Sequence, residues 1–119
     1  MRVSWLLAAL LLSAALAALN LYGLHHYLYW RYEWFDVFMH FLGGLAIGAF
    51  LVGFLVRCRP LLYLVLFYAL VVGWEVFEYL FGIPRASNYA FDTALDLLMD
   101  TFGAAVAYGA ARFSLWRSV

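Results

Sequence analysis

The stretch DTALDLLMDTFG, Asp92 to Gly103, places three aspartates four residues apart in an otherwise apolar segment. Because each residue of an α-helix is rotated by about 100° from the last, Asp92, Asp96 and Asp100 fall within about 80° of one helix face. Carboxylates are unfavourable in an apolar helix unless they are protonated, paired or bound to a cation. The stretch therefore predicts a helix whose acidic face meets polar partners from elsewhere in the chain.

The composition indicates the class of protein in which these acids lie. Of the 119 residues, 69% are hydrophobic and 12% are charged, and the mean hydropathy is +0.93. Charged residues make up about 25% of an ordinary soluble domain. The aromatic fraction of 21% suits helices that end at a membrane interface. We expect a single transmembrane domain over residues 1–119, in contact with the lipid bilayer and without the basic run that nucleic-acid binding requires.

Four apolar segments are long enough to cross the roughly 30 Å of hydrocarbon in a bilayer. They cover about residues 3–24, 36–56, 61–81 and 92–111. The first also resembles a secretory signal peptide, but its apolar run continues past the small residues that would mark a cleavage site. The sequence therefore predicts an all-α integral membrane protein, a four-transmembrane-helix bundle.

The arginines predict the orientation of these helices. Both ends of the chain and the turn between the second and third segments carry arginine, whereas Arg31 and Arg85 lie in the other two loops. Because cytoplasmic loops are enriched in basic residues, we expect an inner-membrane protein with both termini in the cytoplasm. All seven acids then fall in the outer half of the molecule. Two arginines cannot neutralise them, so a further source of positive charge is expected.

The acids and one histidine of the outer half form a candidate metal site. Carboxylate oxygens with one imidazole suit zinc, manganese, iron or magnesium. Other polar residues nearby are candidates for the surroundings or the entrance of the site, and small residues would let the second and fourth helices approach closely. The candidate metal ligands are His40, Glu75, Glu78, Asp96 and Asp100; the surrounding or entrance residues are Asp36, Asp92, Arg85 and His26; the helix-packing residues are Gly44, Gly48, Gly103 and Ala107.

The second and fourth helices also share a pattern. Asp36–Gly44 aligns without a gap on Asp96–Ala104, and in each an acid precedes a ligand-capable residue, His40 or Asp100, by four positions. A pair of small residues follows in both. Because both helices are expected to run inward, the chain resembles two degenerate helical hairpins related by an axis along the membrane normal. The polar ends of the two helices are then expected to face one another.

The same runs carry a family resemblance over about residues 34–109. D-x-x-x-H-x-x-G-G (Asp36–Gly44), W-E-x-x-E (Trp74–Glu78) and D-x-x-x-D-x-x-x-D-x-x-G-A (Asp92–Ala104) resemble the YjdF-like family of uncharacterised inner-membrane proteins. The chain is more distantly similar to VanZ-like proteins, although Glu78 and Asp100 stand where those proteins have amides. The resemblance implies the fold and the polar site, and it carries no settled biochemical activity.

Three functions are compatible with such a site, and the sequence leaves the choice open. A bound metal would activate water in a metal-dependent membrane hydrolase acting on a lipid-linked or cell-envelope substrate. The same acids would serve a proton or cation transport component. Four short helices are few for a transporter, so this function would require a homo-oligomer or a larger membrane complex. The acids would also fix helix packing in a structural or accessory subunit. Because the usual metallohydrolase and serine-hydrolase motifs are missing, no catalytic residue is assigned.

Overall fold

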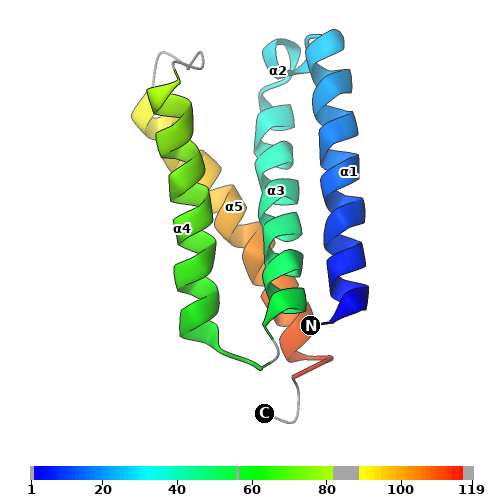
Figure 1. Cartoon of the computed structure of the whole chain (residues 1–119). Helices are drawn as coiled ribbons and strands as arrows, with labels where there is room; N and C mark the ends of the chain where they lie inside the picture. Colours follow the sequence, from blue (N-terminus) through cyan, green and yellow to red (C-terminus); the bar gives the residue numbers. More distant parts are fainter. Residues whose placement is uncertain (1, 56, 82–88, 117–119) are drawn as a thin grey trace.

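The computed structural model describes residues 2–55, 57–81 and 89–116, and these residues form helices and turns with no strand. Four long helices alternate in direction along the described chain, and a short helix lies in the first connection (Figure 1). The helices are α1 (Val3–His25), α2 (Leu28–Arg31), α3 (Glu33–Phe54), α4 (Pro60–Leu80) and α5 (Tyr89–Arg112). The expected all-α architecture is confirmed for this part of the chain.

The short α2 is an element that the sequence did not predict. The chain reverses after α1 at Tyr27, whose φ of 58° lies in the left-handed region. One helical turn follows, and α3 then begins at Glu33 instead of the expected Asp36. The earlier start is favourable because Glu33 and Asp36 both fall in the first turn of α3, where the positive end of the helix dipole stabilises negative charge.

Three of the helices, α1, α3 and α4, are long and apolar enough to cross a membrane. α5 has 24 residues, about 36 Å of helix, but it carries Asp92, Asp96 and Asp100 and does not belong to this set. Within the described residues, helix composition therefore identifies three candidate spans and leaves the expected count of four open.

α3 is the central helix, with α1 along one side and α5 crossing the other (Figure 1). The backbone N–H of Arg2 donates to the carbonyl oxygen of Gly53 at 2.8 Å, which ties the start of α1 to the end of α3. At the opposite end of this helix pair, the ring of Phe35 occupies the space that a side chain on Gly23 would need. Glycines at both ends therefore let α1 lie close against α3.

The backbones of α3 and α5 touch near the middle of the bundle. A Cβ on Gly44 would collide with the backbone carbonyl of Asp100, and a Cβ on Gly103 would collide with the backbone carbonyl of Phe41. Membrane helices approach this closely only where small residues face one another. The contact fixes the level at which the acidic face of α5 meets α3.

α4 packs onto this pair in the half of the bundle near Arg57 and Arg59, which the sequence predicts to be the inner half. Tyr63, Phe67 and Val71 are almost completely buried in one apolar cluster with residues of α3 and α5. The Tyr63 hydroxyl donates to the carbonyl oxygen of Ala104 at 2.7 Å, so the single polar atom of that side chain is satisfied in the core. In the other half, α5 runs from the side of α3 toward α4, and α3 and α4 stand apart (Figure 1).

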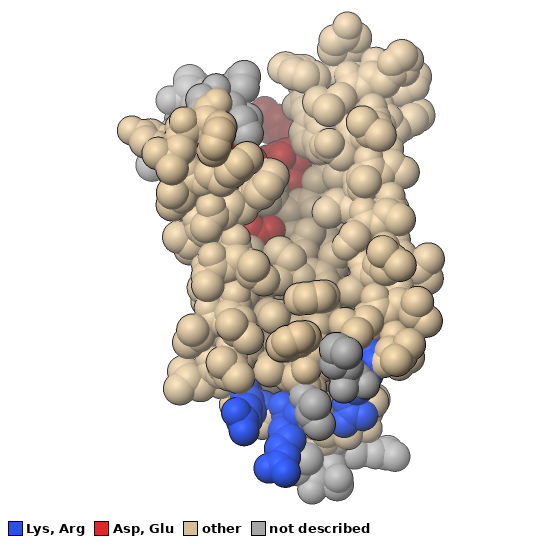
Figure 2. Space-filling view, viewed as in Figure 1, with Lys and Arg blue, Asp and Glu red and all other residues tan. Residues whose placement is uncertain are grey.

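The charged side chains are divided between the two ends of the bundle. Figure 2 shows arginines gathered at the end where the chain passes from α3 to α4, the segment that carries Arg57 and Arg59. Acidic side chains lie in a cleft between α3 and α4 in the other half. The division of charge that the sequence predicts is thus present in the described residues.

Candidate metal centre

His40 is the centre of a polar cluster built by α3 and α5. It follows Asp36 by four residues on α3, and this spacing puts the two side chains on one helix face. Asp96 and Asp100 are related in the same way on α5. Because the two backbones touch at Gly44, the aspartates of α5 lie directly opposite the imidazole.

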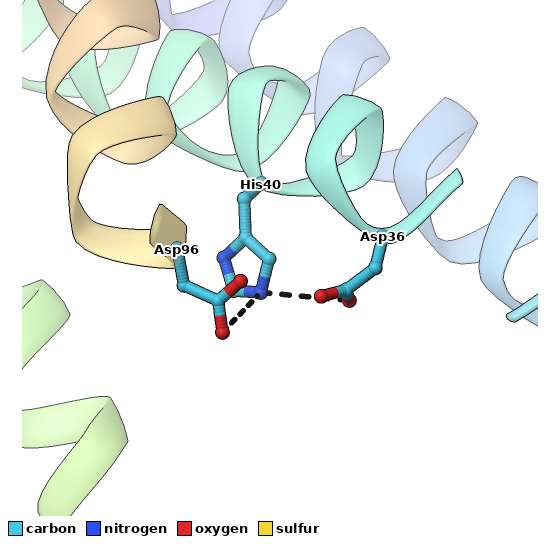
Figure 3. Close-up of side chains that lie close together, drawn as sticks. All are labelled: Asp36, His40 and Asp96. Atoms are coloured by element: carbon cyan, nitrogen blue, oxygen red, sulfur yellow. Dashed lines mark ion pairs between the residues drawn. The ribbon is translucent and has the colours of Figure 1, made fainter. Parts of the chain in front are cut away.

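Two carboxylates face the same nitrogen of the ring. Nε2 of His40 is 3.3 Å from Oδ2 of Asp96 and 3.7 Å from Oδ1 of Asp36 (Figure 3). One ligand atom from each of these three residues lies within 4.8 Å of the other two. Two ligands bound tetrahedrally at about 2.1 Å from one zinc ion would be roughly 3.4 Å apart, so small side-chain rotations would suffice to bring the three atoms around one ion.

Asp100 meets the other ring nitrogen. Its Oδ1 lies 3.2 Å from Nδ1 of His40, within hydrogen-bonding distance. A neutral imidazole has one N–H donor and one lone pair. If Nδ1–H donates to Asp100, the lone pair on Nε2 points toward Asp36 and Asp96. A histidine that binds a metal usually donates its second N–H to a carboxylate in this way.

Burial of the cluster strengthens the repulsion between its carboxylates, because less water screens their charges. The side chains of Asp96 and Asp100 are each about 10% exposed, that of His40 is 21% exposed, and that of Asp36 is 36% exposed. Two unit charges within 4.8 Å repel by roughly 3 kcal/mol at an effective dielectric constant near 20. Water at Asp36 reduces this figure, but three ionised carboxylates around one ring still need compensation, either from a proton on Nε2 or from a metal.

The negative charge of Asp36 also affects the loop at the outer end of the bundle. Tyr29 of α2 donates from its hydroxyl to Oδ1 of Asn20 at 2.6 Å. Burial raises the pKa of the Tyr29 phenol, and the charge of Asp36 raises it further. The phenol therefore stays protonated as a donor, and its hydrogen bond to Asn20 joins α2 to α1.

The structure brings together only part of the ligand set that the sequence suggested. His40, Asp96 and Asp100 are neighbours. Glu75 and Glu78 of α4 lie outside the group whose ligand atoms are within 4.8 Å, as far as the described residues show. Glu75 is buried at a cavity between α4 and α5. Glu78 accepts a hydrogen bond from Nε1 of Trp74 at 2.8 Å.

The positions of two aspartates around the imidazole are exchanged relative to the sequence-based expectation. Asp36, expected at the entrance, faces Nε2 together with Asp96, whereas Asp100, expected to be a ligand, faces Nδ1. The spacing of Asp36 and His40 contained the signal for a shared helix face. The spacing does not specify the side-chain rotamers, and these rotamers decide which ring nitrogen each carboxylate faces.

The remaining expected residues are placed as follows. The ring of His26 lies 4.3 Å from that of Tyr22 at the exposed end of α1 and takes no part in the described cluster. Arg85 and the side chain of Asp92 lie outside the described residues. The four helix-packing residues line the contact of α3 with α5: they are Gly44, Gly48, Gly103 and Ala107.

Comparison with known proteins identifies a family that covers nearly the whole chain. Residues 1–117 match the family described as "Predicted membrane protein (DUF2238)". No curated protein and no solved structure matches the chain. The match supports the expected placement in a family of membrane proteins, while the resemblance to YjdF-like and VanZ-like proteins stays an expectation.

Proposed function

The chain belongs to the DUF2238 family of predicted membrane proteins, and from this premise we propose that it is a four-span membrane protein that binds a divalent metal ion in its outer half. The metal ligands in this proposal are Nε2 of His40 and the carboxylates of Asp36 and Asp96. Asp100 holds the imidazole by accepting from Nδ1. The observation that carries the proposal is this division of the carboxylates between the two ring nitrogens.

The close contact of α5 with α3 supports a role for α5 as the fourth span. α3 is apolar enough to cross the membrane, and α5 touches its backbone at Gly44 and Gly103. A helix of about 36 Å matches the hydrocarbon thickness of roughly 30 Å. Its aspartates are compatible with the membrane because Asp96 and Asp100 face His40 and not lipid. The shared pattern of α3 and α5 then corresponds to two related helical hairpins.

The proposed orientation follows from the division of charge. Arginines gather at one end of the bundle, and the acidic cleft lies in the other half (Figure 2). The positive-inside rule assigns the arginine-rich end to the cytoplasm. In a bacterial cell this corresponds to an inner-membrane protein with cytoplasmic termini, whose metal site is reached from the outer side.

The donor set favours a first-row transition ion such as zinc, manganese or iron. Imidazole binds these ions better than it binds magnesium, and carboxylates accommodate all of them. Three carboxylates and one divalent ion leave a formal charge of −1 around a neutral His40, compared with −3 for the cluster alone. The ion thus compensates charge that two outer arginines leave unbalanced.

We assign the site to hydrolysis of a lipid-linked or cell-envelope substrate. A divalent ion with three protein ligands supplies Lewis-acid activation of water. His40 and its two carboxylate ligands position the ion, and Asp100 keeps the ring in the tautomer that leaves Nε2 available. Asp36, the most exposed side chain of the cluster, leaves the site open to its surroundings.

Metal binding by conservative variants tests this proposal. The purified protein should bind zinc or manganese with one site per chain in a competition titration against a coloured chelator. Asp96→Asn should abolish this binding, because it removes one of the ligands. Asp100→Asn should weaken it by about 10-fold to 100-fold, as expected for the loss of a carboxylate that orients a histidine ligand.

Glu78→Gln is the matched control, because it also neutralises an acid in the outer half but one that bonds to Trp74 outside the cluster. It should bind the metal like the unmodified protein. If the protein binds no divalent ion, or if Asp96→Asn and Glu78→Gln weaken binding equally, the metal site is not where we place it.

A further inference from the structure

A second feature lies beside the metal cluster, a cavity of about 250 Å³ between α4 and α5. Four of the residues around it belong to α4 and two belong to α5. They are Val72, Glu75, Val76, Tyr79, Thr93 and Leu97. Thr93 and Leu97 flank Asp96 on α5, so the cavity and the metal cluster are neighbours on one helix.

The cavity changes in polarity along the helix axes. Tyr79 and Thr93 lie near the outer ends of α4 and α5; Val72 lies about two turns deeper than Tyr79, roughly 10 Å by the helical rise, and Leu97 lies about one turn deeper than Thr93, roughly 6 Å. Glu75 is buried between these levels. The outer end is therefore polar and the inner end apolar, which is the polarity of a membrane lipid in the outer leaflet.

A hydrogen bond joins the two helices below the inner end of the cavity. One turn below Val72 and Leu97, the hydroxyl of Tyr68 lies 2.9 Å from Oγ1 of Thr101. Below that level, Phe67 and Tyr63 are buried in the inner core. The Tyr68–Thr101 pair therefore lies one turn below the innermost residues that line the cavity.

The sides of α4 that flank the cavity are exposed to the bilayer. Val72 and Val76 are each about half exposed, and Gly73, between them, has no atom within 4 Å of where a Cβ would stand. α4 is one of the helices apolar enough to cross a membrane. In a bilayer, hydrocarbon chains would surround this part of the helix and would be the molecules next to an apolar recess on it.

We propose that this cavity receives a hydrocarbon chain of the substrate, which enters sideways from the outer leaflet, so that the substrate of the metal site is a membrane lipid and not a soluble molecule. The chain lies against Val72, Val76 and Leu97. The head group lies at the level of Thr93, next to the turn that carries Asp96. The identification of this lipid as substrate rests on the proposed metal-dependent function, whereas the binding of its chain rests on the cavity alone.

Photo-crosslinking tests the position of the chain. The full protein is reconstituted in vesicles of phosphatidylethanolamine and phosphatidylglycerol that contain a phospholipid with a diazirine in one acyl chain. After irradiation, mass spectrometry should find the adducts concentrated on Val72, Val76 and Leu97. Adducts spread evenly along the exposed side of α4, or absent from these three residues, would overturn the inference.

Cavity-filling variants give a second measurement. Val72→Trp and Val76→Phe should lose most of the adduct at Leu97, because the new side chain occupies the space. Val65→Trp is the control: Val65 is also exposed and lies on nearly the same side of α4, but it is seven residues earlier, below the Tyr68–Thr101 pair. Unchanged adduct formation in both cavity variants would overturn the inference even if one of the two folded poorly.

Metal titration of the same samples separates the two proposals. Val72→Trp should retain metal binding, since Val72 is no ligand. Localised adducts in a protein that binds no metal would overturn the metal-dependent function and leave the lipid cavity in place. Metal binding together with evenly spread adducts would overturn the lipid cavity and leave the metal site in place.

Discussion

The two halves of this bundle differ in how α4 meets its neighbours. In the inner half, Tyr63, Phe67 and Val71 are buried against α3 and α5. In the outer half, the same helix borders a cavity with Val72 and Val76, and it stands apart from α3. The half of α4 that borders the cavity also carries Glu75 and Glu78, whereas the buried half carries no charged side chain, so composition and packing change together along this helix.

The difference follows from what faces α4 in each half. Lipid chains are as apolar as the side chains of a membrane helix, so helices associate through close packing and hydrogen bonds. The inner half offers small partners such as Ala104 and Ala111, which accept the large rings of α4. The outer half offers buried carboxylates, which can be satisfied by a histidine or a cation but not by valine. The acidic face of α5, together with Glu75 and Glu78 of α4 itself, therefore disfavours apolar closure in the outer half.

The contact of α3 with α5 is common to both halves, so breaking it should have the largest effect. In Gly44→Leu, the new side chain would collide with the backbone of Asp100, which cannot move aside as a side chain can. Overpacking costs about 1–3 kcal/mol where neighbours can shift, and we expect more than roughly 3 kcal/mol here. Little monodisperse protein should be recovered in mild detergent, as measured by size-exclusion chromatography and thermal unfolding.

Gly73→Leu is the matched control for that substitution. Gly73 also lies in a membrane-spanning helix, but its surroundings are open. The variant should be as stable as the unmodified protein, within about 0.5 kcal/mol. Equal recovery of Gly44→Leu and Gly73→Leu would show that α3 and α5 are not in backbone contact.

A second effect should distinguish the inner half from the exposed surface of α4. Phe67 is 1% exposed in the inner core, whereas Phe77, ten residues later on the same helix, is 42% exposed. Truncation of a buried phenylalanine to alanine costs about 3–5 kcal/mol. Phe67→Ala should therefore lower the free energy of unfolding by this amount in a denaturation titration with sodium dodecyl sulfate.

Phe77→Ala should cost roughly 0.5 kcal/mol, because lipid replaces the contacts of an exposed ring. Its stacking on Trp74, with ring centroids 5.3 Å apart, is an exposed contact on the same helix and adds little to tertiary stability. If the two substitutions cost the same, α4 is not held mainly by its inner half.

The sequence predicted those features that depend on local periodicity. Apolar runs indicated the long helices, arginine placement indicated the division of charge, and the four-residue spacing of Asp96 and Asp100 indicated a polar face. The sequence did not predict α2, because the left-handed residue that precedes it is Tyr27 and neither glycine nor asparagine. Left-handed backbone at tyrosine is uncommon and has no sequence signal.

The composition of the site was harder to predict for a different reason. The sequence predicts that Glu75 and Glu78 lie at the same depth in the membrane as His40, and this expectation is the basis for including them. Depth does not show whether α4 closes on α3, and no run of small residues on α4 favours closure at that level. The exchange between Asp36 and Asp100 depends on side-chain rotation within one turn, which spacing along a helix does not specify.

The smallest predicted effect concerns the hydrogen bond that joins α4 to α5 at the boundary between the two halves. Oγ1 of Thr101 donates to the carbonyl oxygen of Leu97 at 2.7 Å, which uses its only proton, so the Tyr68 hydroxyl must donate to Thr101. Side-chain hydrogen bonds between membrane helices contribute about 0.6 kcal/mol on average and up to about 1.7 kcal/mol. A double-mutant cycle of Tyr68→Phe and Thr101→Val should give a coupling free energy near 0.6 kcal/mol, because the pair is exposed.

Tyr63→Phe, which removes the buried bond to Ala104, is the comparison and should cost about 1 kcal/mol. A coupling above about 1.7 kcal/mol at Tyr68 would mean that α4 is held as firmly at the edge of the outer half as in the inner core. The contrast between the two halves would then have to be explained by something other than the packing of α4.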